Sequence, residues 1–242
     1  MSKVRPRGQI VVTVEHATSR VPEALAGLGL PRTVLESHVG WDPGTASVGR
    51  ILARAFDAPL HLGKYSRLVA DLNRSHDHPR VVARDLRPSG RRVPGNDLDR
   101  AERIRRLERY WHPWRRAVDE DLDAATTEFG AAFHISVHSF VERLGGQNRN
   151  NDIGLLYDPK HRAERVLADR LDERLSAMGY RVRRNFPYRG IDDGHCMRQR
   201  KHRRHYVGME IEMNQRQVRH AQHARRFGHD LVEAFAPEFD QR

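Results

Sequence analysis

Two histidines and one aspartate lie at positions where they could bind a metal ion together. His16 comes two residues after an apolar, β-rich run at residues 9–14, and His138 follows a second such run at residues 132–137. Asp42 precedes a segment with helical periodicity, from where its carboxylate can face the same point. Two neutral imidazoles and one carboxylate, with a fourth position for water, are a ligand set of catalytic zinc ions. The chain has 15 histidines, most of them expected to be ordinary surface residues, so the argument depends on the shared placement at element ends.

A second group of residues, within the segment Tyr65–Arg74, could bind an anion. Arg67 and Arg74 flank a predicted short strand, and Asn73 stands beside Arg74. A guanidinium group can hold a carboxylate through two parallel hydrogen bonds, so this segment could bind an acidic substrate. On the pattern alone, a structural pairing of Asp71 with one of these arginines is the simpler interpretation.

Two glutamates lie in the β-rich segment at residues 208–214. Because side chains alternate along a strand, Glu210 and Glu212 share one face. A carboxylate on a buried strand is costly unless it is liganded, paired or catalytic. Beside a metal ion, such a glutamate could take a proton from the attacking water and later protonate a leaving amine.

The rest of the pattern predicts an α/β domain that brings these residues to one edge of a sheet. Strands are predicted at residues 9–14, 58–62, 66–71, 132–137, 152–157, 180–182 and 206–213. Helices are predicted over residues 48–55, 104–122, 166–175 and 218–235, with a long polar loop at 76–96. This alternation favours a largely parallel or mixed sheet, and ligands bind outside the carboxyl ends of strands in such folds. No repeat or linker interrupts the pattern, so one domain is predicted over residues 1–242.

The charge balance is strongly basic, which also fits a nucleic-acid partner. The chain of 242 residues has 43 Lys and Arg against 32 Asp and Glu, a net charge of +11. The basic residues are nearly all arginines spread over helices that also carry acids, the pattern of solvated helix faces. Trp111 and Trp114 lie on a helical stripe rather than among arginines on a strand face, which argues against a stacking platform. The Arg- and His-rich stretch at 194–204 is what favours the alternative, a nucleic-acid-binding protein with a degenerate active site.

Cysteine content and hydropathy indicate the cellular location to expect for this protein. Cys196 is the only cysteine, which excludes an internal disulfide and any multi-cysteine zinc site. No apolar run approaches the ~18 residues that a membrane span needs, and the first residues do not resemble a signal peptide. We therefore expect a cytoplasmic protein without a membrane partner.

Six motifs occur in an order typical of one enzyme family. They are Val14–Ala17, His38–Gly44, Tyr65–Arg74, His138–Phe140, Asp152–Tyr157 and Asn185–Tyr188. With these motifs the sequence resembles the N-formylglutamate amidohydrolase family, from about residue 10 to residue 235. No single motif decides the matter, but the ordered set covers nearly the whole chain.

The resemblance implies a fold and an activity. The family is similar to the zinc peptidases, which include carboxypeptidases and cell-wall amidases, so a three-layer, zinc-carboxypeptidase-like α/β fold is expected. It implies one zinc ion per chain and hydrolysis of a small acidic N-acyl amino acid, foremost N-formyl-L-glutamate, to L-glutamate and formate, a reaction of histidine degradation. An amidase for another N-acyl or cell-wall peptide substrate is the alternative within the same class.

The resemblance also implies roles for individual residues. His16, Asp42 and His138 would be the metal ligands, with His38 and Glu15 as fallback ligands. The general base would be Glu212, because its Ile-Glu-Met setting matches the relatives' strand best, with Glu210 as second choice. The run from Asp71 to Arg74 is similar to the substrate-carboxylate-binding stretch of zinc carboxypeptidases. By that similarity, a substrate carboxylate would be held by Arg67, Asn73 and Arg74.

Overall fold

A six-stranded sheet forms the centre of the computed structural model, which describes residues 9–191, 194, 199, 203 and 205–239. Cys196 and most of the stretch at 194–204 lie outside the described residues. The strand order is β2-β1-β5-β10-β8-β9. The strands are β1 (Ile10–Val14), β2 (Leu60–Leu62), β5 (Ala132–Phe140), β8 (Ile153–Leu156), β9 (Val182–Arg184) and β10 (Tyr206–Asn214). Only the β10–β8 pairing is antiparallel, so the prediction of a mixed, largely parallel sheet is confirmed.

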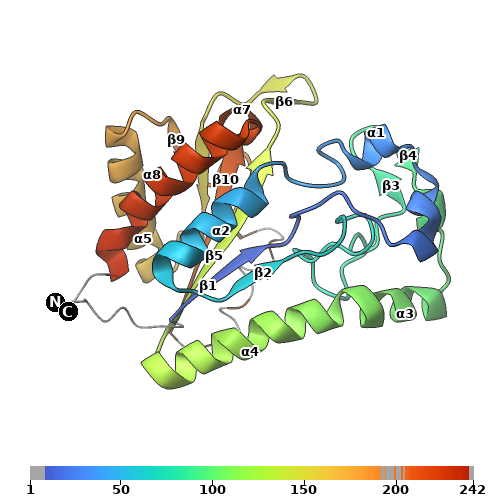
Figure 1. Ribbon diagram of the computed structural model, residues 1–242, viewed down its shortest axis with the longest axis horizontal. Coiled ribbons are helices and arrows are strands. Elements are labelled where there is room, and N and C mark those ends of the chain that lie inside the picture. Colours follow the sequence, from blue (N-terminus) through green and yellow to red (C-terminus); the bar gives the residue numbers. More distant parts are fainter. Residues whose placement is uncertain (1–8, 192–193, 195–198, 200–202, 204, 240–242) are drawn as a thin grey trace.

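Helices cover both faces of this sheet and give three layers (Figure 1). One face is covered by α2 (Thr45–Phe56), α5 (Arg162–Ala177) and α8 (Ala221–Phe239). The other face is covered by α4 (His112–Phe129), which continues from α3 (Arg100–Tyr110). The expected three-layer α/β class is therefore confirmed. None of the described helices is long and apolar enough to cross a membrane.

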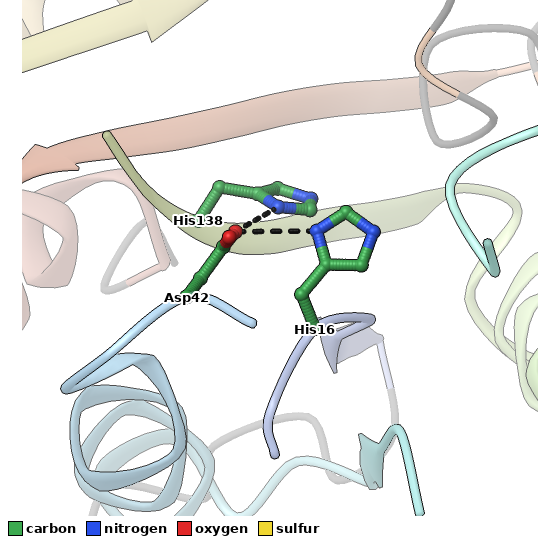
Figure 2. Close-up of side chains that lie close together, drawn as sticks. All are labelled: His16, Asp42 and His138. Atoms are coloured by element: carbon green, nitrogen blue, oxygen red, sulfur yellow. Dashed lines mark hydrogen bonds and ion pairs between the residues drawn. The ribbon is translucent and has the colours of Figure 1, made fainter. Parts of the chain in front are cut away.

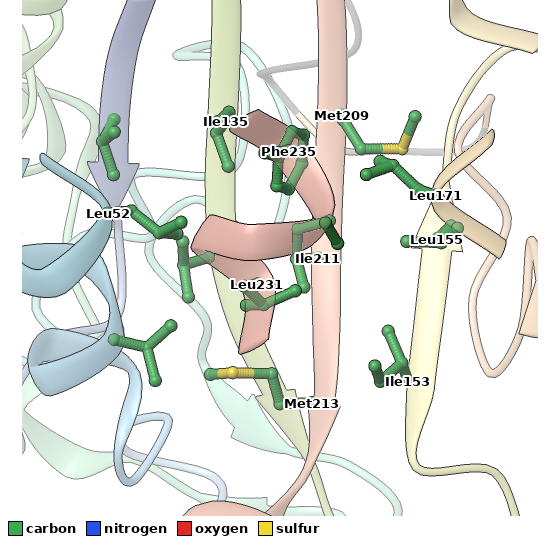
Figure 3. Close-up of a cluster of buried hydrophobic side chains, with 14 of the residues drawn as sticks. Leu52, Ile135, Ile153, Leu155, Leu171, Met209, Ile211, Met213, Leu231 and Phe235 are labelled. Atoms are coloured by element: carbon green, nitrogen blue, oxygen red, sulfur yellow. The ribbon is translucent and has the colours of Figure 1, made fainter. Parts of the chain in front are cut away.

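The main core lies between the sheet and the helices α2, α5 and α8. Met209, Ile211 and Met213 of β10 point into it and meet side chains of α8 and α5, among them Phe235 and Leu171 (Figure 3). Because strand side chains alternate, the residues between them face the α4 side. On that side the central strands carry buried polar groups, namely Thr13, His134, Ser136, Glu210 and Glu212. One face of the sheet thus contributes to the apolar core, and the other face carries buried polar side chains along the central strands.

The predicted strand at residues 66–71 is wrong, because this segment consists of turns. The Ser66 hydroxyl donates to the carbonyl of Gly40 and accepts from the backbone N–H of Leu68, while the N–H of Asp71 donates to the carbonyl of Val81. The apolar side chains of the segment are buried against other loops rather than in the sheet. A short apolar run indicates burial, and periodicity alone does not distinguish a strand from a packed loop.

The predicted helix over 104–122 is two helices, α3 and α4, which meet at Trp111. Pro113 lies in the first turn of α4, where a missing backbone N–H costs nothing, and so favours a new helix start. Trp111 is buried beneath the turns and Trp114 is partly buried. Ile104 faces solvent, 46% exposed, and does not belong to the buried stripe.

The remaining elements are short and lie in the connections. The predicted loop at 76–96 contains a hairpin of β3 (Asp85–Leu86) and β4 (Arg91–Arg92) and ends in the 3-10 helix η2 (Pro94–Asn96). A second hairpin joins β6 (Arg143–Leu144) to β7 (Gln147–Asn148). Further short helices also lie in these connections. The 3-10 helix η1 (Glu23–Gly29) and then α1 (Arg32–Leu35) come before α2, and α7 (Gln215–Val218) comes before α8.

Candidate metal centre and active site

The two histidines and the aspartate singled out in the sequence lie together at the edge of the sheet. His16 follows β1, His138 lies near the end of β5, and Asp42 comes from the turn before α2 (Figure 2). Asp42 Oδ2 is 3.2 Å from Nδ1 of His16 and 2.9 Å from Nδ1 of His138. All three side chains are buried, and one ligand atom of each lies within 4.8 Å of the others. Among the described residues, these three form the group that could hold a metal ion.

The outer nitrogens of both imidazoles also face carboxylates. His16 Nε2 is 2.7 Å from Asp71 Oδ1, and His138 Nε2 is 3.3 Å from Glu15 Oε2. A carboxylate only accepts hydrogen bonds, and a neutral imidazole has a single N–H. If the N–H of each ring faces Asp71 or Glu15, both Nδ1 lone pairs point at the negative oxygen of Asp42. A cation at this point removes that conflict, so the donor set fits a divalent metal, and imidazole with carboxylate suits zinc.

The neighbouring carboxylates favour a positive charge at His138. Burial alone would lower the pKa of His138, but its hydrogen bonds to Asp42 and Glu15 raise it well above the ordinary value. Burial alone would raise the pKa of Asp42, but the charges of His16 and His138 lower it well below the ordinary range. The protein thus keeps Asp42 ionised among the two imidazoles, as a metal ligand must be.

Glu15, a fallback ligand in the sequence analysis, lies behind His138 instead of beside Asp42. Its carboxylate is fully buried and accepts hydrogen bonds from Thr13 at 2.9 Å and Ser136 at 2.8 Å. This position is that of an outer carboxylate that orients a metal-binding imidazole. His38, the other fallback ligand, lines the cavity but does not belong to the convergent group.

The Glu15→Gln substitution should weaken metal binding about 10- to 100-fold, because an amide orients the imidazole less well than a carboxylate does. The measurement is a competition titration of the purified variant with a metal chelator. Asp121→Asn is a matched control, since Asp121 Oδ2 lies 2.7 Å from Nε2 of His61, outside the convergent group. Wild-type affinity in Glu15→Gln would show that Glu15 does not support His138.

Both predicted glutamates line the same cavity of about 430 Å³ as His16, Asp42 and His138. Glu210 Oε1 accepts a hydrogen bond from Asn73 Nδ2 at 2.8 Å. Glu212 lies opposite His138 in the β10–β5 pairing, and its buried Oε2 has no hydrogen-bond partner. Burial raises the pKa of Glu212 to about 8, and the nearby carboxyls of Asp42 and Glu210 add to the shift. A carboxyl with such a pKa can exchange a proton near neutral pH, as a general base must.

The predicted carboxylate-binding residues also line this cavity, but all three contact the protein's own carboxylates. Arg67 donates from its NH2 nitrogen to Asp71 Oδ2 at 2.9 Å, and Asn73 donates to Glu210. Arg74 Nε lies 4.0 Å from Asp71 Oδ2. The structural pairing of Asp71 that the sequence left open is therefore present, closely with Arg67 and at longer range with Arg74. Asp71 joins this pairing to His16, a link that the sequence pattern did not indicate.

Several cavity residues received no role from the sequence. Ser139 donates its backbone N–H to Asp42 Oδ2 at 3.4 Å and its hydroxyl to the carbonyl of Pro43. Tyr188 and Gln215 form further parts of the wall. The motif at residues 185–188 was the only sequence signal for Tyr188.

Fold and site together define an α/β protein with a candidate metal centre at the carboxyl ends of its strands. The particular family follows from the sequence as a whole. The profile of the N-formylglutamate amidohydrolase family matches residues 8–218, and the chain belongs to that family. The resemblance inferred from the six motifs is confirmed, and the protein is an amidohydrolase.

Solved structures share the fold of this chain. The chain is similar to the crystal structure of a gene product of Agrobacterium tumefaciens, with 31% identity, a TM-score of 0.84, and coverage of 95% of this chain and 90% of that one. It is also similar to the N-formylglutamate amidohydrolase of Ralstonia eutropha JMP134, with 19% identity, a TM-score of 0.71, and coverage of 96% and 93%. At that lower identity, the second likeness shows a common fold alone. No curated protein matches the sequence.

Proposed function

We propose that this amidohydrolase uses one zinc ion per chain to hydrolyse a small acidic N-acyl amino acid, foremost N-formyl-L-glutamate, to L-glutamate and formate. The observation that carries the proposal is the convergence of two Nδ1 atoms on one Asp42 oxygen in a chain of this family. Family membership favours hydrolysis over the nucleic-acid-binding alternative. A single domain and a cytoplasmic location are part of the proposal.

The positions of the side chains at the cavity support the proposed roles in the reaction. His16, Asp42 and His138 would hold the metal ion. Zinc, when bound, supplies a Lewis acid for the scissile carbonyl and lowers the pKa of water toward about 7. Glu212 takes a proton from the attacking water and passes it to the nitrogen of the leaving amine, and Glu210 is the second choice for this role.

Substrate binding would use the basic side of the cavity. In the proposal, Arg67, Asn73 and Arg74 hold a carboxylate of the substrate. The guanidinium of Arg67 stays charged, because Asp71 and Asp42 raise its pKa against the opposing effect of burial. The ion pair with Asp71 fixes the orientation of the Arg67 guanidinium in advance, so a substrate carboxylate would join an existing ion-pair network.

The proposal is tested by metal analysis together with an assay of formate release. We expect purified protein to contain about one zinc per chain, to lose hydrolysis of N-formyl-L-glutamate on chelation, and to regain it when zinc is added. Full activity in protein stripped of metal would contradict the zinc proposal. Faster turnover of a cell-wall amide than of N-formyl-L-glutamate would favour the alternative substrate class.

A further inference from the structure

The loop that carries Tyr188 is fixed tightly to β8 at the wall of the cavity. The side-chain oxygen of Asn185 accepts hydrogen bonds from the backbone N–H groups of Tyr157 at 3.2 Å and Gly190 at 2.8 Å. Gly154 lets the loop approach, because a Cβ at this position would lie 2.2 Å from a carbonyl oxygen of the loop. A loop held by such backbone contacts presents its side chains in defined positions.

A buried arginine stands behind Tyr188. Arg149 is 6% exposed, and its guanidinium lies over the rings of Phe140 at 5.9 Å and Tyr188 at 5.1 Å. Its NH1 nitrogen donates to the Tyr188 hydroxyl at 3.2 Å, and its Nε has no hydrogen-bond partner. Within the described part of the chain, no carboxylate forms an ion pair with Arg149. A buried cation without an anionic partner is costly, so an anion bound nearby would stabilise Arg149.

The Tyr188 hydroxyl is left with a proton to donate. It accepts the hydrogen bond from Arg149, and no described side chain accepts from it. Desolvation and the nearby Glu212 carboxyl raise the pKa of Tyr188, so the phenol keeps its proton at neutral pH. Tyr188 lines the cavity that holds the candidate metal ligands, so this donor can meet a bound substrate.

Arg67, Arg74 and Arg189 line the cavity itself, whereas Arg149 lies behind Tyr188. Arg67 is paired with Asp71, on the side of His16, whereas Arg149 is paired with aromatic rings. An acidic amino acid such as glutamate has two carboxylates, which one binding group cannot hold at two places. A substrate of this class therefore requires a second group with positive potential.

We propose that the Tyr188 hydroxyl, backed by Arg149, binds one of the two carboxylates of a dicarboxylic N-acyl amino acid, while Arg67, Asn73 and Arg74 bind the other. This inference rests on the proposed function for its substrate class, and it adds the site that selects a second carboxylate. Tyr188 supplies the direct hydrogen bond, and Arg149 strengthens it by polarising the phenol.

The test is direct calorimetric binding of three ligands to the zinc-loaded protein: L-glutamate, L-glutamine, and L-isoglutamine, in which the α-carboxylate is an amide. Tyr188→Phe should weaken the binding of L-glutamate about tenfold, the usual effect of losing a hydrogen bond to a charged group. The variant should weaken the binding of one of the two monoamides, L-glutamine or L-isoglutamine, by the same factor and leave the affinity for the other unchanged. The reason is that only one of them retains the carboxylate that Tyr188 binds. Arg74→Lys should give the opposite pattern for the two monoamides.

Two further variants keep the test decisive. Arg149→Met removes the cation but keeps an unbranched side chain, and it should produce the same monoamide pattern as Tyr188→Phe. Arg183→Gln is the matched control, since the Arg183 guanidinium lies over the Phe186 ring at 3.9 Å, and all three affinities should stay at the wild-type value. Equal weakening of all three ligands by Tyr188→Phe, or no weakening, would overturn the inference. The assay needs no turnover, so absent hydrolysis of N-formyl-L-glutamate by wild-type protein would instead count against the proposed function.

Discussion

His138→Ala should reduce the zinc content from about one ion per chain to nearly none and abolish hydrolysis. The Nδ1 atom of His138 makes the shorter of the two imidazole contacts with Asp42, 2.9 Å against 3.2 Å for His16. Without it, two protein ligands remain of the three that a catalytic zinc site uses, and such a site is weak and open. His16→Ala should have the same effect for the same reason. Zinc content is measured by elemental analysis after dialysis, and activity by formate release.

His134→Ala separates loss of a ligand from loss of a buried side chain. His134 lies on the same strand and face as His138, but its nitrogens lie 2.8 Å from the Thr13 hydroxyl and 2.7 Å from the Tyr206 hydroxyl. Burial lowers the pKa of His134 to about 3, so this imidazole stays neutral at the pH of the assay. This variant should melt at a lower temperature yet retain stoichiometric zinc. Stoichiometric zinc of wild-type affinity in His138→Ala would show that the proposed ligand set is wrong.

Glu212→Gln should lower the turnover number at least about 100-fold while zinc stays bound, because glutamine preserves the shape of the side chain but cannot accept the proton. Glu212 fits the role of base better than Glu210, because its Oε2 is free of hydrogen bonds and its pKa is raised to about 8. Glu210 instead accepts from Asn73. The measurement is the turnover number at saturating N-formyl-L-glutamate, with zinc content determined on the same preparation.

Glu210→Gln is the companion variant for this experiment. An amide at this position can still accept the hydrogen bond from Asn73, so we expect a smaller loss of turnover than in Glu212→Gln. If Glu210→Gln shows the large loss and Glu212→Gln does not, the roles of the two glutamates are exchanged.

The sequence carried local information about the strand ends. Alternation along residues 208–214 placed Glu210 and Glu212 on one face, and both line the cavity. The β-rich runs before His16 and His138 became neighbouring parallel strands, so both side chains reach the same edge of the sheet. These predictions succeeded because side-chain alternation and strand-end placement depend on short-range periodicity.

The prediction of a strand at 66–71 was wrong because the local sequence pattern did not show which part of the chain this segment packs against. Its apolar residues are buried, as the pattern indicated, but loops rather than neighbouring strands bury them. The hydrogen bond between the backbone N–H of Asp71 and the carbonyl of Val81 replaces a strand pairing. Burial is therefore encoded in the composition of a segment, whereas the partner that buries it is not.

By itself the sequence determined the α/β class, the family, and the residue types that gather at the strand ends. Only the tertiary structure decided which carboxylate stands behind each imidazole, and that Arg149 packs on aromatic rings. Asp71 reaches His16 across 55 positions of the chain, and Arg149 reaches Tyr188 across 39. Such pairings depend on how turns, sheet register and loop packing combine, and no period within a single segment records the distance between two segments.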